Sequence, residues 1–350
     1  MTHKPIHQGM IGCLALFVCW SGCTPSGQPL ATSPPMRRVW PEPPAEPRIR
    51  YLGSIDTEQS IKRSRSLLEG LGEVVFGKRD MGVLVAPSAL AMSPEGGLYV
   101  ADSGGGVIHL FDYRNRCYRQ FGQMGQDQSL QRPVGLTLVG ASLYVVDSAL
   151  HRVCVFGLTG EFVIAFGESY LTRPSGIAYH PDRQELYVSD TGAHRIVVFH
   201  PSGRYLRTMG SRGTGPGQFN FPTHLWVDSG GRLLISDTLN YRIQIVSLEE
   251  GTFTTWGEHG DRPGYFGHPG GVATDRNGHV YVTDRQFENV QIFDRYGRIL
   301  MAFGKEGHDP GDFWLPSGLT IDERNWIYVA DTFNKRIQVF EIVENLNHDN

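Results

Sequence analysis

The sequence predicts an all-β protein, a six-bladed β-propeller whose blades are four-stranded antiparallel sheets. The first observation is a phrase that recurs six times. Its aspartates stand 45, 43, 47, 47 and 47 residues apart, at Asp102, Asp147, Asp190, Asp237, Asp284 and Asp331. The second is that the segments between them read as short strands without a helical period. A steady period of roughly 40 to 50 residues is typical of stacked supersecondary units.

The second repeat shows how each blade is expected to form. Residues 133–139, 142–146, 152–156 and 161–166 are short runs rich in Val, Leu, Ile and Phe, bounded by Gly, Asp and Ser. Such runs are typical of strands joined by tight turns, which gives a four-stranded meander. A meander of this kind has two apolar faces. Six of them stacked around an axis cover both faces and protect the strand edges.

The ring has to close, and the two ends of the chain indicate how. After the third strand of the last repeat, at 336–343, seven residues remain, too few for a fourth strand. Residues 48–55 have strand composition and contain a Leu-Gly that resembles the Phe-Gly ends of other fourth strands. We predict that this N-terminal strand completes the last blade. Residues 56–80 are expected to be a short helical insertion, because Asp56 suits a helix start.

The first 22 residues are predicted to be a signal peptide. Lys4 precedes an apolar run from Met10 to Trp20, which is too short to span a bilayer. The run ends in Ser-Gly-Cys, which resembles the lipobox of bacterial lipoproteins, although Trp20 departs from its usual aliphatic residue. The resemblance implies cleavage before Cys23 and lipidation of this cysteine. A soluble secreted protein and a retained anchor helix are the alternatives.

These predicted segments divide the chain into four parts. Residues 23–47 are rich in proline and are expected to form an extended tether, the propeller to occupy 48–344, and 345–350 to be a tail. We therefore expect an exported protein of the cell envelope, held to a membrane by lipid, on the periplasmic side of the outer membrane if the source cell has one.

Composition and charge set further limits. The chain has 350 residues, 40% hydrophobic and 19% charged, which suits a globular domain. A net charge of −4, without long basic runs, gives no electrostatic reason to expect nucleic acid. Cys117 and Cys154 lie outside any CxxC spacing, so they do not indicate zinc. The sequence leaves open whether these two pair or remain separate thiols.

The recurring phrase is interpreted as a structural device. Each aspartate ends a second strand where the chain must turn, and its short carboxylate can accept backbone N–H groups there. Four repeats place an arginine five residues later, where a bidentate ion pair with the aspartate is predicted. These arginines are Arg152, Arg195, Arg242 and Arg336.

The pattern D-T-x-N-x-R-I-Q-V-F, with P-x-G opening and F-G closing each unit, resembles the NHL repeat over roughly residues 86–343. The resemblance implies a propeller that presents a surface to other macromolecules, and NHL propellers mostly bind proteins or RNA. Because the charge disfavours nucleic acid, we expect a protein-binding scaffold with protein partners and a membrane contact through its lipid.

Enzymes with similar propellers provide the alternative function. Peptide-amidating lyases resemble this family and bind zinc through histidines directly after the opening prolines. This chain has Ser88, Val134, Ser175, Thr223, Gly270 and Ser317 at those places. Gluconolactonase-like hydrolases gather Glu, Asn and Asp around a divalent ion, and these types are missing from the strand starts. We predict no catalytic residue, metal site or cofactor, while a metal-dependent lyase or hydrolase and a purely structural envelope protein remain alternatives.

The predicted binding face carries the turns after the second strands and the links into the first strands. His224 is the only imidazole just after the opening prolines. Arg285 and Phe287 occupy the altered turn of the fifth repeat, Tyr241 a turn of the fourth, and Trp314 the link into the sixth. These five are the expected contact residues. Such departures from a repeat mark either a binding surface or drift in loops.

Overall fold

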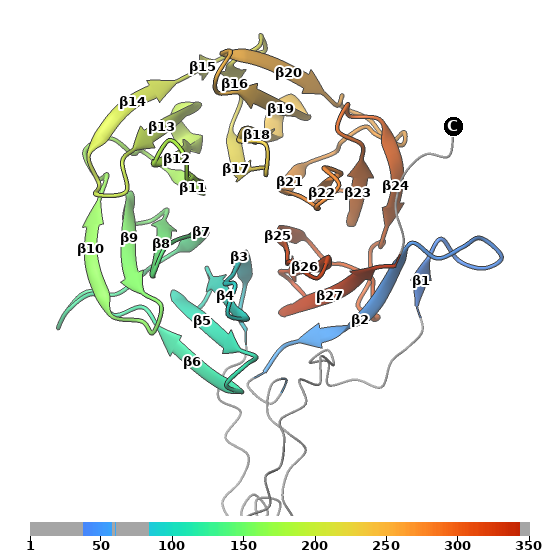
Figure 1. The fold of residues 1–350 in the computed structure, drawn as a ribbon, viewed down its shortest axis with the longest axis horizontal. Helices are drawn as coiled ribbons and strands as arrows, with labels where there is room; N and C mark the ends of the chain where they lie inside the picture. The colour runs from blue at the N-terminus through green and yellow to red at the C-terminus, as the bar shows by residue number, and fades with distance from the viewer. Residues whose placement is uncertain (1–37, 58–59, 61–83, 344–350) are drawn as a thin grey trace, which may run out of the picture.

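The computed structural model describes residues 38–57, 60 and 84–343, which form a closed ring of six sheets around a central axis (Figure 1). Within this part of the chain, helix is limited to single turns such as η2 (Thr191–Ala193) and η3 (Thr238–Asn240). No helix in it is long and apolar enough to cross a membrane. The predicted signal peptide, Cys23, the predicted tail at 345–350 and nearly all of the predicted helical insertion lie outside the described residues.

The first strand of each blade lies nearest the axis and the fourth at the rim, as Figure 1 shows. Blade 1 is β3 (Pro87–Met92), β4 (Gly97–Asp102), β5 (Val107–Asp112) and β6 (Cys117–Phe121); blade 2 is β7 (Pro133–Val139), β8 (Ser142–Asp147), β9 (Arg152–Gly157) and β10 (Phe162–Phe166). Blade 3 is β11 (Pro174–His180), β12 (Glu185–Asp190), β13 (Arg195–Phe199) and β14 (Tyr205–Met209); blade 4 is β17 (Pro222–Val227), β18 (Arg232–Asp237), β19 (Arg242–Ser247) and β20 (Thr252–Trp256). Blade 5 is β21 (Pro269–Thr274), β22 (Val280–Asp284), β23 (Asn289–Phe293) and β24 (Ile299–Phe303). The short strands β15 (Ser211–Arg212) and β16 (Gln218–Phe219) pair in the link before blade 4. The predicted fold is confirmed.

Blade 6 joins the two ends of the chain. Its inner strands are β25 (Pro316–Ile321), β26 (Trp326–Asp331) and β27 (Arg336–Ile342), and its fourth strand is β2 (Ile49–Ile55), which pairs antiparallel with β27. The alternating residues Ile49, Tyr51 and Ile55 are buried, so this strand contributes to the core as well as to the sheet. The prediction that an N-terminal strand closes the ring is confirmed.

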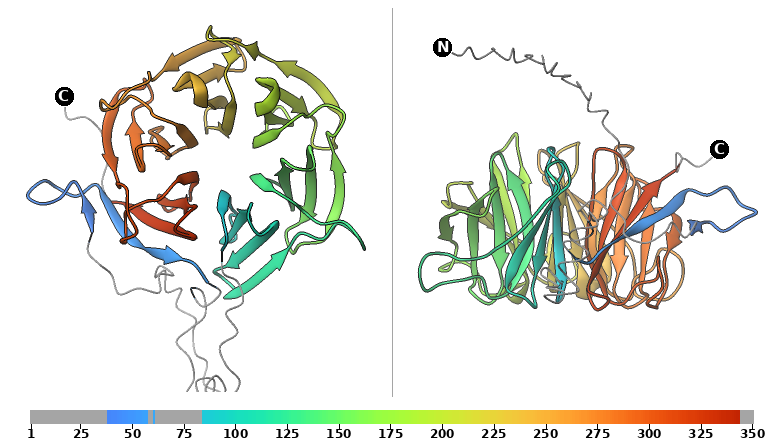
Figure 2. Two further views of the ribbon diagram at one scale, coloured as in Figure 1. Left: turned by 180° about the vertical axis from the view of Figure 1, so that it is seen from behind. Right: turned by 90° about the horizontal axis from the view of Figure 1, so that it is seen from below.

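The described structure includes a strand that precedes the predicted start of the propeller. β1 (Val39–Trp40) adds a fifth strand outside β2, and the connection between them projects from the rim (Figure 2). The Trp40 ring lies 5.7 Å from Phe303 and 5.8 Å from Phe340, measured between ring centroids. Arg38 forms an ion pair of 2.6 Å with Asp312. The predicted tether is therefore wrong for residues 38–47, because proline content carries no information about these aromatic and ionic contacts.

The core consists of apolar layers between neighbouring blades. Phe219, Phe266 and Phe313, from the links that enter blades 4, 5 and 6, are fully buried within these layers. The two cysteines do not pair: Cys154 is buried and Cys117 half-buried, and both are free thiols. Burial raises the pKa of Cys154 to about 12, so this thiol stays protonated and unreactive at neutral pH.

Candidate functional site

The six recurring aspartates define one face of the ring. Each ends a second strand and stands opposite the proline that opens the first strand of the same blade, as in Pro87↔Asp102 and Pro316↔Asp331. The turns after the second strands and the links into the first strands therefore lie together, and we call this surface the loop face. It comprises residues 84–86, 130–132, 171–173, 219–221, 266–268 and 313–315 of the links and residues 103–106, 148–151, 191–194, 238–241, 285–288 and 332–335 of the turns.

All six aspartates are fully buried, and their carboxylates hold the loop face together. In blade 2, Asp147 accepts N–H groups from Ala149 and Leu150 in the turn, both at 3.0 Å, as predicted. It also accepts the N–H groups of Gln131 and Arg132 from the link, which sequence reasoning missed. A buried carboxylate requires such partners, and here they join the turn to the link.

The environment of each carboxylate decides its acidity. Burial by itself would raise the pKa of Asp102, but hydrogen bonds from His109 and from the backbone of Val85 and Ala86 hold it at about 2. In blade 6 burial prevails and raises the pKa of Asp331, although Trp314 N–H and Arg336 act in the opposite direction. Equivalent positions of the repeat therefore differ in acidity.

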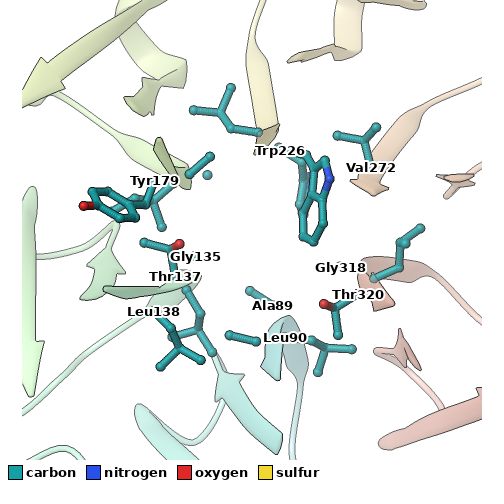
Figure 3. A pocket seen from close by; sticks show the side chains of 18 of the residues that line it. Ala89, Leu90, Gly135, Thr137, Leu138, Tyr179, Trp226, Val272, Gly318 and Thr320 are labelled. Atoms are coloured by element: carbon teal, nitrogen blue, oxygen red, sulfur yellow. The ribbon is translucent and has the colours of Figure 1, made fainter. Parts of the chain in front are cut away.

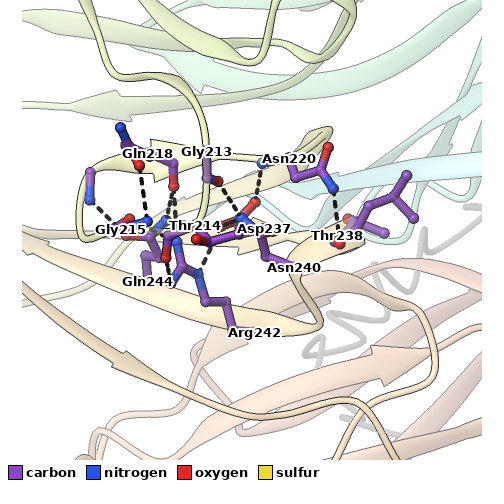
Figure 4. A network of polar contacts seen from close by, with 12 residues as sticks. Gly213, Thr214, Gly215, Gln218, Asn220, Asp237, Thr238, Asn240, Arg242 and Gln244 are labelled. Carbon is purple, nitrogen blue, oxygen red and sulfur yellow. Dashed lines mark hydrogen bonds and ion pairs between the residues drawn. The ribbon is translucent and has the colours of Figure 1, made fainter.

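Three of the four predicted arginine–aspartate pairs are present. Nε of Arg195, Arg242 and Arg336 lies 3.1, 2.9 and 2.8 Å from Oδ2 of its aspartate. The pairs are not bidentate, because the remaining N–H groups donate to backbone carbonyls of the link. Arg242, for example, donates to Thr214 and Gly215 (Figure 4).

The predicted pair of Arg152 with Asp147 is wrong. The Nε of Arg152 donates to the Leu150 carbonyl at 3.4 Å instead. Both oxygens of Asp147 already accept backbone N–H groups from the turn and the link. In blade 3, by contrast, the link N–H groups bind only Oδ1 of Asp190, which leaves Oδ2 for Arg195.

A cavity of about 260 Å³ lies on the axis and is lined by the first strands of all six blades (Figure 3). Most of its lining is Ala, Gly, Val and Leu, and it includes no carboxylate. The large side chains in the lining include Tyr179 from β11 and both His224 and Trp226 from β17. Burial, assisted by the charge of Arg285, lowers the pKa of His224 to about 4. The imidazole is therefore neutral at pH 7 and can act as a hydrogen-bonding group.

The structure places four of the five predicted contact residues on the loop face and the fifth, His224, on β17 at the end next to it, but does not bring all of them together. His224 lies at the mouth of the channel, close enough to Arg285 to be affected by its charge. Tyr241 and Phe287 lie half-buried in separate turns. Trp314 is 41% exposed and belongs to a third location on blade 6.

An aromatic cluster surrounds Trp314. Its ring centroid lies 5.4 Å from that of Phe333 and 4.9 Å from that of His308. Phe333 is 52% exposed, and sequence reasoning missed it. The available signal was an apolar side chain at the second turn position, where three other repeats have Gly104, Ala149 and Gly192. Among the residues that the structure describes, no group of three or more His, Cys, Asp or Glu is placed to hold a metal ion.

Comparisons with known proteins agree with this architecture. A family model described as a 6-bladed beta-propeller matches residues 168–260 and 271–348. "Protein brain tumor" of Drosophila melanogaster is 30% identical over 125 residues, which cover 34% of this chain and only 12% of that protein.

Solved structures show the same ring at low identity. An auxiliary nutrient binding protein from Bacteroides ovatus superimposes with a TM-score of 0.59 at 14% identity, over 76% of this chain and 71% of that one. Virginiamycin B lyase from Staphylococcus aureus does so with a TM-score of 0.53 at 14% identity, over 75% and 86%. At this identity the likeness concerns the fold alone, and together with the matching family model it shows that this chain is a six-bladed β-propeller.

Proposed function

We propose that this protein is an exported, lipid-anchored NHL-type propeller that binds a protein partner through its loop face. The observation that carries the proposal is the exposed cluster of Trp314, Phe333 and His308. Tryptophan and other large aromatic side chains supply much of the binding energy in protein interfaces. A pair of half-exposed aromatic rings in contact on one surface is therefore a suitable centre for an interface.

The cluster is rigidly supported, which favours binding. The Trp314 N–H donates to the buried Asp331 at 2.7 Å, and the Phe333 N–H donates to the Trp314 carbonyl at 3.1 Å. The backbone that carries each ring is thus fixed to the network that holds blade 6 together. A binding surface on a backbone that is already ordered loses less conformational entropy when a partner arrives.

The test uses affinity purification from membranes, followed by mass spectrometry. We expect Trp314→Ala combined with Phe333→Ala to lose a partner that the unaltered protein retains. Tyr296→Ala is the matched control. Tyr296 is 70% exposed, but it lies in the turn between β23 and β24, on the face of the propeller opposite the loop face. A double variant that keeps every copurifying protein would contradict the proposal.

Anchoring through Cys23 is tested separately. We expect Cys23→Ser to move the protein from the membrane fraction to the soluble fraction and to abolish incorporation of labelled fatty acid. Elemental analysis of the purified protein addresses the alternative of a metal-dependent lyase or hydrolase. A stoichiometric divalent metal would support that alternative against a purely binding role.

A further inference from the structure

The seam between blades 4 and 5 departs from the repeat at several adjacent positions. The second residue after the opening proline is Ala89, Gly135, Gly176, Gly271 or Gly318 in five blades but His224 in blade 4. The residue after the recurring aspartate is Ser or Thr in five blades but Arg285 in blade 5. His224 lines the central cavity, and Arg285 on the neighbouring blade lies close enough for its charge to lower the pKa of His224.

The glycine position is sterically restricted in the other blades. A Cβ atom on Gly135 would lie 2.2 Å from the Ser175 carbonyl oxygen, and one on Gly176 would lie 2.2 Å from that of Thr223. Neighbouring first strands therefore approach too closely there for a side chain. His224 stands where the facing strand, β21, has Gly270 and Gly271 directly after its first residue, Pro269. The imidazole thus occupies a space that the repeat normally closes.

Arg285 replaces a side chain that normally links neighbouring blades. In three blades the equivalent threonine donates to the carbonyl of the next opening proline: Thr191 to Pro222 at 2.6 Å, Thr238 to Pro269 at 3.0 Å, and Thr332 to Pro87 at 2.8 Å. Blade 5 lacks this hydrogen bond. Its arginine lies over Gly270 instead, where a Cβ atom would be 3.5 Å from Cγ and Cδ of Arg285.

The guanidinium of Arg285 has no anionic partner among the described residues. Its Nε is buried without a hydrogen-bond partner. The oxygens of the adjacent Asp284 accept backbone N–H groups from Gly267, His268 and the turn. Glu288 accepts the backbone N–H of Leu315 at 2.5 Å. It forms no ion pair with Arg285. The Arg285 side chain as a whole is half-buried, and a cation partly removed from water without an ion pair gains from pairing with an anion.

Glu288 is close enough for its charge to act on Arg285, but no described residue neutralises the guanidinium through an ion pair. Burial and the charge of Arg285 lower the pKa values of both His224 and His268, so both imidazoles are neutral at pH 7. Two residues beyond His224 on β17, Trp226 also lines the cavity and extends into it (Figure 3). Two residues of a strand span roughly 7 Å. The site thus combines a single cation, a neutral hydrogen-bonding ring and an apolar, aromatic channel.

We propose that the seam between blades 4 and 5 binds a small organic carboxylate, whose acid group pairs with Arg285 and whose apolar body enters the channel beside Trp226. A guanidinium presents a planar pair of donors that matches a carboxylate. One cation matches one negative charge, whereas a phosphate site typically recruits more positive groups. The apolar lining favours an aromatic or aliphatic body over a sugar or a second charge.

The proposal is tested by calorimetric titration with indole-3-acetate and 3-phenylpropanoate, each compared with its neutral amide. We expect the acids to bind and the amides to bind about tenfold or more weakly, because a hydrogen bond to a charged group is worth about 1.5 kcal/mol or more. Arg285→Thr should weaken acid binding by about the same factor. Arg132→Gln, an exposed arginine of the same face in blade 2, should leave it unchanged.

The threonine substitution also keeps the test independent of folding. It restores the residue that three other blades use to bind the next opening proline, so the melting temperature should stay equal or rise while binding is lost. Trp226→Leu should weaken binding of indole-3-acetate more than binding of inorganic phosphate. Equal affinity of acid and amide, unchanged binding by Arg285→Thr, or tighter binding of inorganic phosphate than of either acid would overturn the proposal.

This site is separate from the aromatic cluster of blade 6. Loss of a protein partner in the Trp314 and Phe333 double variant together with normal carboxylate binding would support both proposals. Loss of carboxylate binding in Arg285→Thr with an unchanged set of copurifying proteins would support the channel site alone. The two experiments therefore fail independently.

Discussion

Asp237 is the residue whose replacement tests most directly how the blades are held. Its carboxylate is fully buried and accepts hydrogen bonds from Asn220 N, Asn240 Nδ2, Arg242 Nε and Gln244 Nε2, at 2.7 to 2.9 Å. Asp237→Asn keeps the shape but removes the charge and places an N–H₂ group against these donors. Breaking one partner of a buried ion pair typically costs about 3 to 5 kcal/mol.

We expect the free energy of unfolding to fall by about 3 kcal/mol or more. The hydrogen bonds from Arg242 to Thr214 and Gly215 of the link hold the guanidinium in place, so its charge stays at the site without an anionic partner. Urea denaturation followed by tryptophan fluorescence measures this as a lower midpoint at constant slope. Asp294→Asn is the control. Asp294 makes similar bonds to Arg298, but its partner is exposed, so the loss should stay below about 1 kcal/mol. Equal losses at the two positions would refute the reasoning that burial of the whole ion pair decides its contribution.

Three further predictions concern the ring. Trp40→Ala should destabilise the protein by about 2 to 3 kcal/mol, less than for a fully buried tryptophan, and an unaltered melting temperature would show that β1 adds nothing. Gly176→Ala should cost about 1 to 3 kcal/mol, measured by the same urea titration, because its Cβ would lie 2.2 Å from the Thr223 carbonyl oxygen. Asp102 has a pKa of about 2, against an ordinary value of 3.8, so it contributes about 2 kcal/mol that is fully present above pH 4 and disappears as the pH falls through 2. The stability gap between wild type and Asp102→Asn should therefore narrow on acidification, and a constant gap from pH 5 to pH 2 would count against the hydrogen bond from His109.

Much of the fold could be predicted because the repeat encodes it locally. Each blade contains its own alternation of Val, Ile, Tyr and Phe and its own turn aspartate, so the strand order within a blade needs no information from elsewhere. The strand at 48–55 was predictable for the same reason, since one blade lacked its fourth strand. Trp40 and Arg38 were not, because their partners Phe303 and Asp312 lie at the other end of the chain.

The candidate sites were predictable only as departures from the pattern. His224, Arg285 and Trp314 stood out because they occupy positions where the other repeats have small or different residues. That His224 and Arg285 lie near each other, while Trp314 packs against Phe333 on another blade, follows from the closed ring and from no local signal. Arg152 is the opposite case, since it matches the repeat pattern but forms no ion pair with Asp147. Both oxygens of Asp147 already accept hydrogen bonds from backbone N–H groups.

By itself, then, the sequence determined the number of blades, their internal strands and the aspartates that end the second strands, since each of these depends on neighbours within a few residues. The tertiary structure alone decided which donors each carboxylate accepts, where Trp40 and Arg38 pack, and which arginine is left without an ion pair. Those outcomes depend on distances between residues of different blades, which are fixed only when the ring closes and adjacent first strands approach to the limit that a missing Cβ allows.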